Sequence, residues 1–406
     1  MNNKLTEIFK IISFYDDYRW EFSHNYNNLI NFFRKDLEAD IKILTHWLCY
    51  ITDRQMSFQR IWDIGGFVLS ELIYEIKKQN SLNLLKPEGK NSFVIKEDED
   101  DKYTFISKSI PDNNSILIQY NNILEKGKVK FKSRFFPSDY LAILYTFVFL
   151  EDYAYSFSKF IKEIYCLHKE KSDFIKRILF SLYLLTYYEI GQPKSSDLSN
   201  FADNIEKANE RKNKIRDILR NTDKFNDEYN AFLEDKVFKQ KRAWCSLRDF
   251  LKSPEFKQYF KEALIEESLN DNDFKKLFSY DSLTQLELPG DVWNNNSKFR
   301  NCILKDTDYE KTKAPLNKIL REYFNKNCQH IIGYPEQFDI TFDFVPRMCD
   351  LNNCDLCPIF RINNKKNNFN KICLKNKKMF CPVILVSCNY KNNCKGNDDC
   401  KIVNLY

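Results

Sequence analysis

Cysteine is the residue type whose placement in this 406-residue chain is least random. Eight of the thirteen cysteines fall between residues 349 and 400. They are Cys349, Cys354, Cys357, Cys373, Cys381, Cys388, Cys394 and Cys400. Thiolates at short spacings are the ligands with which a small, loop-rich segment holds a zinc ion or an iron–sulfur cluster. The spacing therefore predicts a metal-binding module in this part of the chain.

The first part of this series is the tightest ligand set. Cys354 and Cys357 form a CxxC pair that is followed by Pro358, and Cys349 lies five residues upstream. A CxxC pair lets two thiolates reach one metal from a single turn, and a third thiolate can complete the loop around it. Either Cys373 or Cys381 can supply the fourth ligand. Redox chemistry at the CxxC pair and buried free thiols are the alternatives.

The second part is a regularly spaced series formed by Cys381, Cys388, Cys394 and Cys400. Four thiolates complete a tetrahedral site, so eight cysteines can serve two centres, either in sequence or interleaved. No histidine lies within the series, which indicates ligation by cysteine alone. A four-thiolate set suits zinc and a 4Fe-4S cluster equally, so the ligand type does not choose between them.

Positive charge is concentrated in the same segment. From residue 347 onward, eleven basic and four acidic residues give a net charge of +7, against +6 for the whole chain. A basic segment stapled by metal is the electrostatic footprint expected of a nucleic-acid contact. The other interpretation is a solvated surface whose lysines provide solubility.

One loop resembles a known family. Cys354-Asp355-Leu356-Cys357-Pro358, with Cys349 before it, is similar to the iron–sulfur loop of the helix-hairpin-helix DNA glycosylase superfamily. Residues 292–300 (VWNNNSKFR) resemble the segment that carries the catalytic aspartate of that family, and Asn295 lies 54 residues before Cys349. The resemblance implies a four-iron cluster and contact with DNA.

The chain departs from the family pattern at several positions. The first two cysteines enclose four residues rather than six, and fifteen residues rather than five separate Cys357 from Cys373. An asparagine stands at the position of the catalytic aspartate. The resemblance therefore does not imply glycosylase activity, and catalytic residues stay unassigned.

Other catalytic signatures are absent from the sequence. It contains no glycine-rich phosphate loop, no GxSxG and no HExxH. Its four histidines, His24, His46, His168 and His330, are isolated from one another, and an isolated histidine is more often structural than catalytic. Triad chemistry and histidine-based metal hydrolysis are thus disfavoured.

Composition and apolar runs indicate a folded cytoplasmic protein. Hydrophobic residues make up 43% and aromatic residues 16% of the chain, which is ample for real cores. The N-terminus lacks a signal-peptide pattern. The longest apolar run, Leu141–Leu150, is far shorter than the ~20 residues that a membrane span needs. Thiols stay reduced in the cytoplasm, which favours metal ligation over disulfides.

The order of these features predicts a mainly α fold in which multi-helix domains precede the cysteine-rich module. Glycine and proline are scarce, and apolar residues recur at helical spacing. We expect a helical domain at 1–190 with a small β or disordered insert near 81–135. A second helical domain at 191–345 and the metal-binding module at 346–406 follow.

Individual elements can be placed within these domains. Strands are predicted at Phe93–Ile95, Tyr103–Ile106, Ser115–Tyr120 and Val129–Phe131. Helices are predicted at Ile41–Tyr50 and Phe58–Lys78, from Pro137 to about Tyr188, and at Phe201–Arg220, Lys236–Leu251 and Glu255–Leu269. The helix at 201–220 mixes acids and bases at i,i+3 and i,i+4 spacing, which is typical of a solvated face.

Together these patterns favour a nucleic-acid-binding protein, of DNA-repair or DNA-processing type, with a C-terminal iron–sulfur or zinc centre. The first alternative is a helical scaffold that binds a protein partner and carries a zinc-stapled tail. A second alternative is an iron–sulfur redox enzyme of another kind.

Overall fold

The computed structural model describes residues 37–52, 65–97, 102–107, 129–131, 137–190, 200–234, 239–252, 254–279 and the positions 281, 282, 285, 304, 311, 312, 314 and 319. The chain divides into two compact units, Asn27–Gln285 and a second one made of Met1–Tyr26 and Leu286–Tyr406. Almost every described residue belongs to the first, which is called the helical unit below. All eight clustered cysteines lie outside the described residues.

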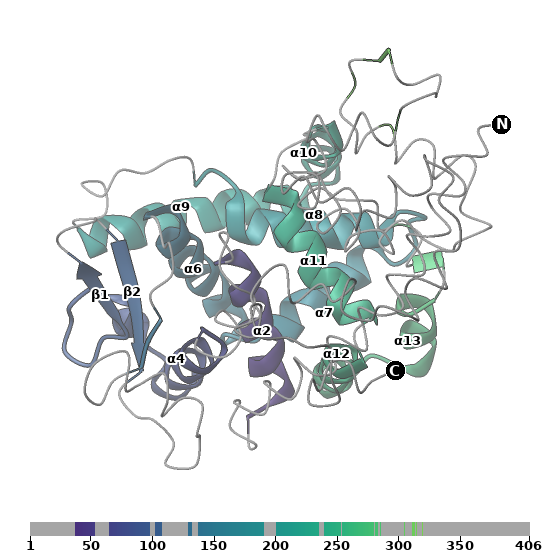
Figure 1. Cartoon of the computed structure of the whole chain (residues 1–406). Helices are drawn as coiled ribbons and strands as arrows, with labels where there is room; N and C mark the ends of the chain where they lie inside the picture. The colour runs from purple at the N-terminus through teal and green to yellow at the C-terminus, as the bar shows by residue number, and fades with distance from the viewer. Residues whose placement is uncertain are drawn as a thin grey trace, which may run out of the picture. The chain divides into compact units, whose positions relative to one another are not determined.

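The described chain is mainly helical, as predicted (Figure 1). The α-helices are α2 (Ala39–Ile51), α4 (Gly66–Gln79), α6 (Pro137–Leu150), α7 (Phe157–His168), α8 (Phe174–Tyr187), α9 (Phe201–Arg220), α10 (Thr222–Glu234), α11 (Lys239–Lys252), α12 (Pro254–Glu266) and α13 (Asp271–Leu277). Two 3-10 turns, η3 (Leu82–Leu85) and η4 (Glu151–Tyr153), accompany them. None of the described helices is long and apolar enough to cross a bilayer.

Two helices form the centre of the unit and are buried on nearly every side. All α6 residues from Asp139 to Leu150 are buried, and so are nearly all residues of α2. A helix that is hydrophobic all round must be covered on all sides. Accordingly, α6 packs against α8 and α9, while α2 packs against α4, α11 and α12.

The predicted insert contains a small antiparallel sheet in the order β1-β2-β3. The strands are β1 (Val94–Glu97), β2 (Lys102–Ser107) and β3 (Val129–Phe131), with Phe105 opposite both Val94 and Phe131. The sheet packs on α4 and α6. Tyr103 stacks on Tyr140 of α6 with ring centroids 4.5 Å apart. The predicted strand at 115–120 lies outside the described residues.

Helix α9 is only partly the solvated helix that its charge pattern predicted. Most of its charged residues are exposed, as predicted, but Arg211 and Lys212 are buried. The charge pattern alone did not indicate this burial, which arises because α9 packs across α6 and α8. Lys212 pairs there with Glu151 and Asp152 of η4 at 3.4 and 3.5 Å.

The predicted boundary at residues 190 and 191 falls between two helices of the same unit. α9 packs on α6, and α11 packs on α8, so helices from both sides of this boundary share one core. The boundary at 345 and 346 lies outside the described residues. The three-part division of the chain stays a prediction.

Candidate functional site

The predicted metal ligands cannot be placed, because Cys349, Cys354, Cys357, Cys373, Cys381, Cys388, Cys394 and Cys400 lie outside the described residues, as does the segment 292–300. Within the described part, no three or more histidine, cysteine, aspartate or glutamate side chains form a group that could hold a metal ion. Of the cysteines in the helical unit, Cys49 is buried in α2 and Cys166 is exposed on α7. The metal centre is therefore still a prediction from the spacing of the cysteines.

A buried polar group joins α2 to α11 and is called the His46 cluster below. It consists of His46 and Tyr50 from α2 and of Ser246, Arg248 and Asp249 from α11. His46 Nδ1 lies 3.0 Å from the Ser246 hydroxyl, and His46 Nε2 lies 3.2 Å from Asp249 Oδ2. The Tyr50 hydroxyl donates to the same Oδ2 at 2.6 Å.

The Asp249 carboxylate is the shared acceptor of this cluster. Its other oxygen, Oδ1, accepts from Arg248 Nε at 3.0 Å and from Arg248 Nη2 at 2.8 Å. Burial of the imidazole favours the neutral form of His46, and the charge of Arg248 acts in the same direction. Nε2–H donates to Asp249, and Nδ1 accepts the Ser246 hydroxyl proton. Burial lowers the pKa of His46, and this effect outweighs the opposing pull of Asp249.

Serine, histidine and aspartate are also the components of a nucleophilic triad, so the exposure of this cluster decides its chemistry. Ser246 and His46 have 0% of their surface exposed. The rings of Tyr50, Phe250 and Phe256 pack around the imidazole at centroid distances of 4.0 to 4.9 Å. A substrate cannot reach the Ser246 oxygen in this arrangement, so the cluster fastens α2 to α11. The burial of His46 agrees with the structural role expected from the sequence.

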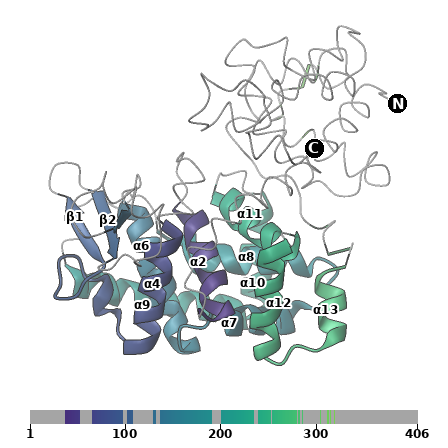
Figure 2. The same ribbon diagram turned by 60° about the horizontal axis from the view of Figure 1, so that its bottom comes forward.

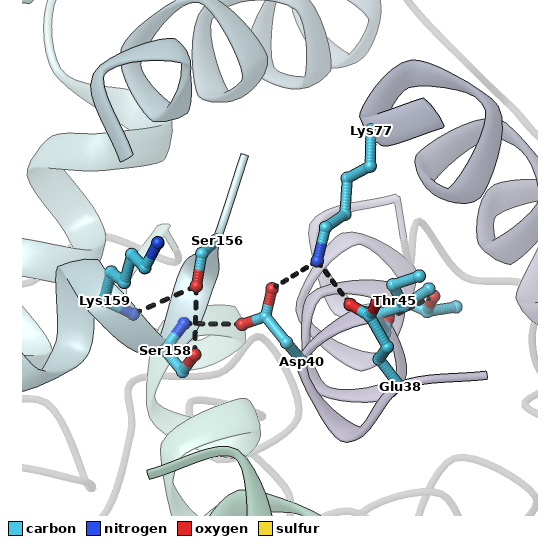
Figure 3. Close-up of polar contacts among 8 residues, drawn as sticks. Glu38, Asp40, Thr45, Lys77, Ser156, Ser158 and Lys159 are labelled. Atoms are coloured by element: carbon cyan, nitrogen blue, oxygen red, sulfur yellow. Dashed lines mark hydrogen bonds and ion pairs between the residues drawn. The ribbon is translucent and has the colours of Figure 1, made fainter. Parts of the chain in front are cut away.

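A second buried group, the Asp40 cluster, ties α2 to α4 and α7 (Figure 3). Asp40 Oδ1 accepts from the backbone N–H of Ser158 at 2.7 Å, and Asp40 Oδ2 accepts from Lys77 Nζ at 3.3 Å. Lys77 also reaches Glu38 at 2.7 Å. The carboxylate of Asp40 thus neutralises the positive end of α7 from a neighbouring helix, while Ser156 caps α7 locally by accepting from the N–H of Lys159.

The carboxylates of Glu38, Asp40 and Glu266 lie near one another at this cluster. The ammonium group of Lys77 occupies the position among them that a metal cation would need. Burial lowers the pKa of Lys77, but the charges of Asp40 and Glu38 outweigh burial and raise it overall. Burial raises the pKa of Glu266, and the charges of Glu38 and Asp40 raise it further. The ammonium group of Lys77 therefore serves as the internal counter-ion, and the cluster is structural.

Arg211 provides the main polar link between α9 and α8. Its guanidinium donates to the backbone carbonyls of Leu184, Leu185 and Tyr188 at 2.5 to 3.1 Å, where the C-terminal end of α8 has carbonyls without helical partners. The same group lies over the ring of Tyr145. Burial lowers its pKa to about 10, so it stays charged at neutral pH.

His168, at the end of α7, is the second buried histidine. Its Nε2 has no hydrogen-bond partner among the described residues. The ring packs on Phe225 of α10, with centroids 4.4 Å apart. Burial and the charge of Arg177 lower the pKa of His168 to about 4, so the imidazole is neutral and structural.

Sequence reasoning did not find the His46 cluster, the Asp40 cluster or the Arg211 contacts that fasten these helices. The partners of His46 lie about 200 residues away, and those of Asp40 lie 37 and 118 residues away. No local spacing reports such pairs, because only the tertiary packing brings them together. Comparison of the chain with models of known protein families, with curated proteins and with solved structures gives no match.

Proposed function

We propose that the chain is a nucleic-acid-binding protein whose cysteine-rich segment, residues 346–406, holds an iron–sulfur cluster or zinc. One observation carries this proposal: the eight clustered cysteines and a net charge of +7 occupy the same stretch of sequence. Metal ligation would give this segment a stable fold, because folding and metal binding are coupled in small metallo-modules. Its lysines and arginines would then contact phosphate groups.

The buried polar groups of the helical unit are used to join helices, which leaves the cysteine-rich segment as the proposed place of ligand binding. In the His46 and Asp40 clusters, the charged groups have partners inside the unit and join helices. The chemistry of these groups is therefore structural. The segment with unassigned chemistry is the cysteine-rich one, and the resemblance of the Cys354–Cys357 loop to that of iron–sulfur DNA glycosylases agrees with a DNA ligand.

The ligands proposed for a first centre are Cys349, Cys354 and Cys357, with Cys373 or Cys381 as the fourth. The remaining cysteines would serve a second centre. A cluster or zinc ion would staple the loops, and Lys375, Lys377 and Lys378 lie between Cys373 and Cys381. These three lysines would therefore contact phosphate.

The test is the binding of a fluorescently labelled oligonucleotide to the full chain over a range of salt concentrations. Binding should weaken steeply as salt rises, since each phosphate contact releases counterions. The triple variant K375Q/K377Q/K378Q should reduce the salt slope by roughly 3, about one per lysine. A matched change of exposed, ion-paired lysines, K214Q/K224Q, should leave the slope close to that of the wild type.

Absence of oligonucleotide binding by the metal-loaded full chain would contradict the proposal. If the cysteine-to-serine variants instead lost a protein partner, the scaffold alternative would account for the tail.

A further inference from the structure

Two lysines on α12 lie over aromatic rings that follow on from it in the chain. Lys257 Nζ is 5.0 Å from the ring centroid of Phe278, and Lys261 Nζ is 5.6 Å from that of Phe274. The two rings lie nearly parallel, at 9°, with centroids 6.2 Å apart. The helices α12 and α13 lie next to each other (Figure 2), and the contacts of Lys257 and Lys261 bring both ammonium groups to the same pair of rings.

Several lysines of the other helices pair with a carboxylate; examples are Lys77 with Asp40, Lys169 with Asp273, Lys212 with Glu151, Lys214 with Glu189 and Lys224 with Asp217. Neither Lys257 nor Lys261 has an acidic partner among the described residues. The neighbouring acid on α12, Glu262, accepts a hydrogen bond from Gln258 at 2.9 Å. The two ammonium groups are therefore available to an external anion.

The geometry of the pair suits an anion with repeated charges. Residues four apart on a helix rise by ~6 Å and lie on one face. A cation–π contact at an exposed site contributes ~0.5–1 kcal/mol, which holds each lysine stem against a ring. A lysine that is already ordered loses less side-chain entropy when it binds a ligand. Two ordered, unpaired cations on one helix face can thus contact neighbouring phosphates of a nucleic-acid strand.

We propose that the face of α12 formed by Lys257 and Lys261 contacts the phosphate backbone of the nucleic acid. This inference rests on the proposed function and adds a second contact, within the helical unit, to the basic cysteine-rich segment. The contact reads no bases, because lysine binds phosphate as a point charge. It would increase affinity without changing sequence preference.

The experiment compares two double variants of the full chain that remove the same charge. K257Q/K261Q removes the unpaired lysines, and K214Q/K224Q removes lysines that pair with Glu189 and Asp217. The salt dependence of binding is measured with a labelled single-stranded oligonucleotide. We expect K257Q/K261Q to lower the salt slope by roughly 2, one per lysine, and K214Q/K224Q to leave it nearly unchanged. Both variants should keep the circular dichroism spectrum of the wild type.

The outcomes separate this inference from the proposed function. If the wild-type chain binds no oligonucleotide, both fail. If the wild type binds and the two double variants have the same slope, only the contact at α12 is wrong. If K257Q/K261Q loses affinity for a polyglutamate peptide but keeps the wild-type slope for the oligonucleotide, the face binds acidic protein segments and the inference is overturned.

Discussion

The helical unit and the cysteine-rich segment use their polar residues in opposite ways. In the helical unit, buried ionisable groups such as Asp40, Asp249, Arg211 and Arg248 bind one another or backbone groups, and each contact joins two helices or completes a cluster that does. In the segment 346–406, eight cysteines and an excess of lysine have no such structural explanation in the sequence. The buried contacts stabilise the first region, and ligand binding is what we propose for the second.

The largest effect expected within the helical unit comes from Asp249→Ala. Arg248, His46 and Tyr50 would lose the carboxylate to which they all donate, and breaking a buried charge pair costs about 3–5 kcal/mol. Urea unfolding of the full chain measures this loss. Metal content should not change, since the cluster belongs to the structural region. A loss below about 1 kcal/mol would show that the His46 cluster does not fasten α2 to α11.

Arg211→Ala should produce the next largest loss, about 2–3 kcal/mol. The substitution removes charge-assisted hydrogen bonds to three carbonyls at the end of α8. Lys214→Ala is the matched control on the same helix. Its ammonium pairs with Glu189 at the surface, where solvent screens the charges, so we expect a much smaller loss than for Arg211→Ala. Equal losses for the two variants would contradict the different roles given to the two side chains.

Acidification should weaken the helical unit through its two buried histidines. The pKa of His168 falls from 6.5 to about 4 on folding, and burial also lowers the pKa of His46. The unfolded chain therefore binds more protons than the folded one in this range. The contribution of the two neutral histidines to the free energy of unfolding is complete above pH 6.5 and is lost as pH falls from 6.5 toward 4.

The pH dependence of the unfolding free energy checks this expectation in the wild type and in His168→Gln. The variant should show a shallower decline below pH 6.5, because one titrating group is gone. An unchanged decline would mean that His168 does not contribute to acid sensitivity.

A smaller effect is expected from Asp40→Asn. The amide oxygen can still accept from the N–H of Ser158, but the charge that attracts Lys77 and the positive end of α7 is lost. We expect a loss of about 1–2 kcal/mol from the weaker helix-end interaction. Thermal or urea unfolding of Asp40→Asn and Asp249→Ala, measured side by side, shows which cluster contributes more to the free energy of unfolding. A loss for Asp40→Asn that exceeds the loss for Asp249→Ala would reverse this ranking.

Local sequence patterns predicted much of the fold because many helix boundaries are determined by residues at or next to the helix ends. Pro137 at a helix start predicted α6, and the apolar spacing of residues 41–50 predicted α2. The helix at Phe201–Arg220 has the predicted bounds. Two less apolar helices were not predicted: α10, and the short α13, which begins with the capping box of Asn270 and Asp273.

The polar clusters could not be predicted from the same patterns. The charge spacing of α9 correctly indicated exposure of Glu206 and Lys214 but not burial of Arg211, because the C-terminal end of α8 that receives it is defined only by packing. Likewise, nothing near His46 in the sequence points to Asp249. The cysteines predicted to bind metal are the reverse case: their spacing is conspicuous in the sequence, and they lie outside the described residues.

The most direct test of the division of roles is the metal content of the full chain purified without oxygen, together with its visible absorbance. The account predicts bound iron with cluster absorbance, or bound zinc in a colourless protein. It also predicts that Cys354→Ser and Cys394→Ser each lower the metal content while Asp249→Ala does not. Loss of half the metal in each cysteine variant would indicate two independent centres. A wild-type chain without bound metal, with the clustered thiols all reactive, would contradict the central claim.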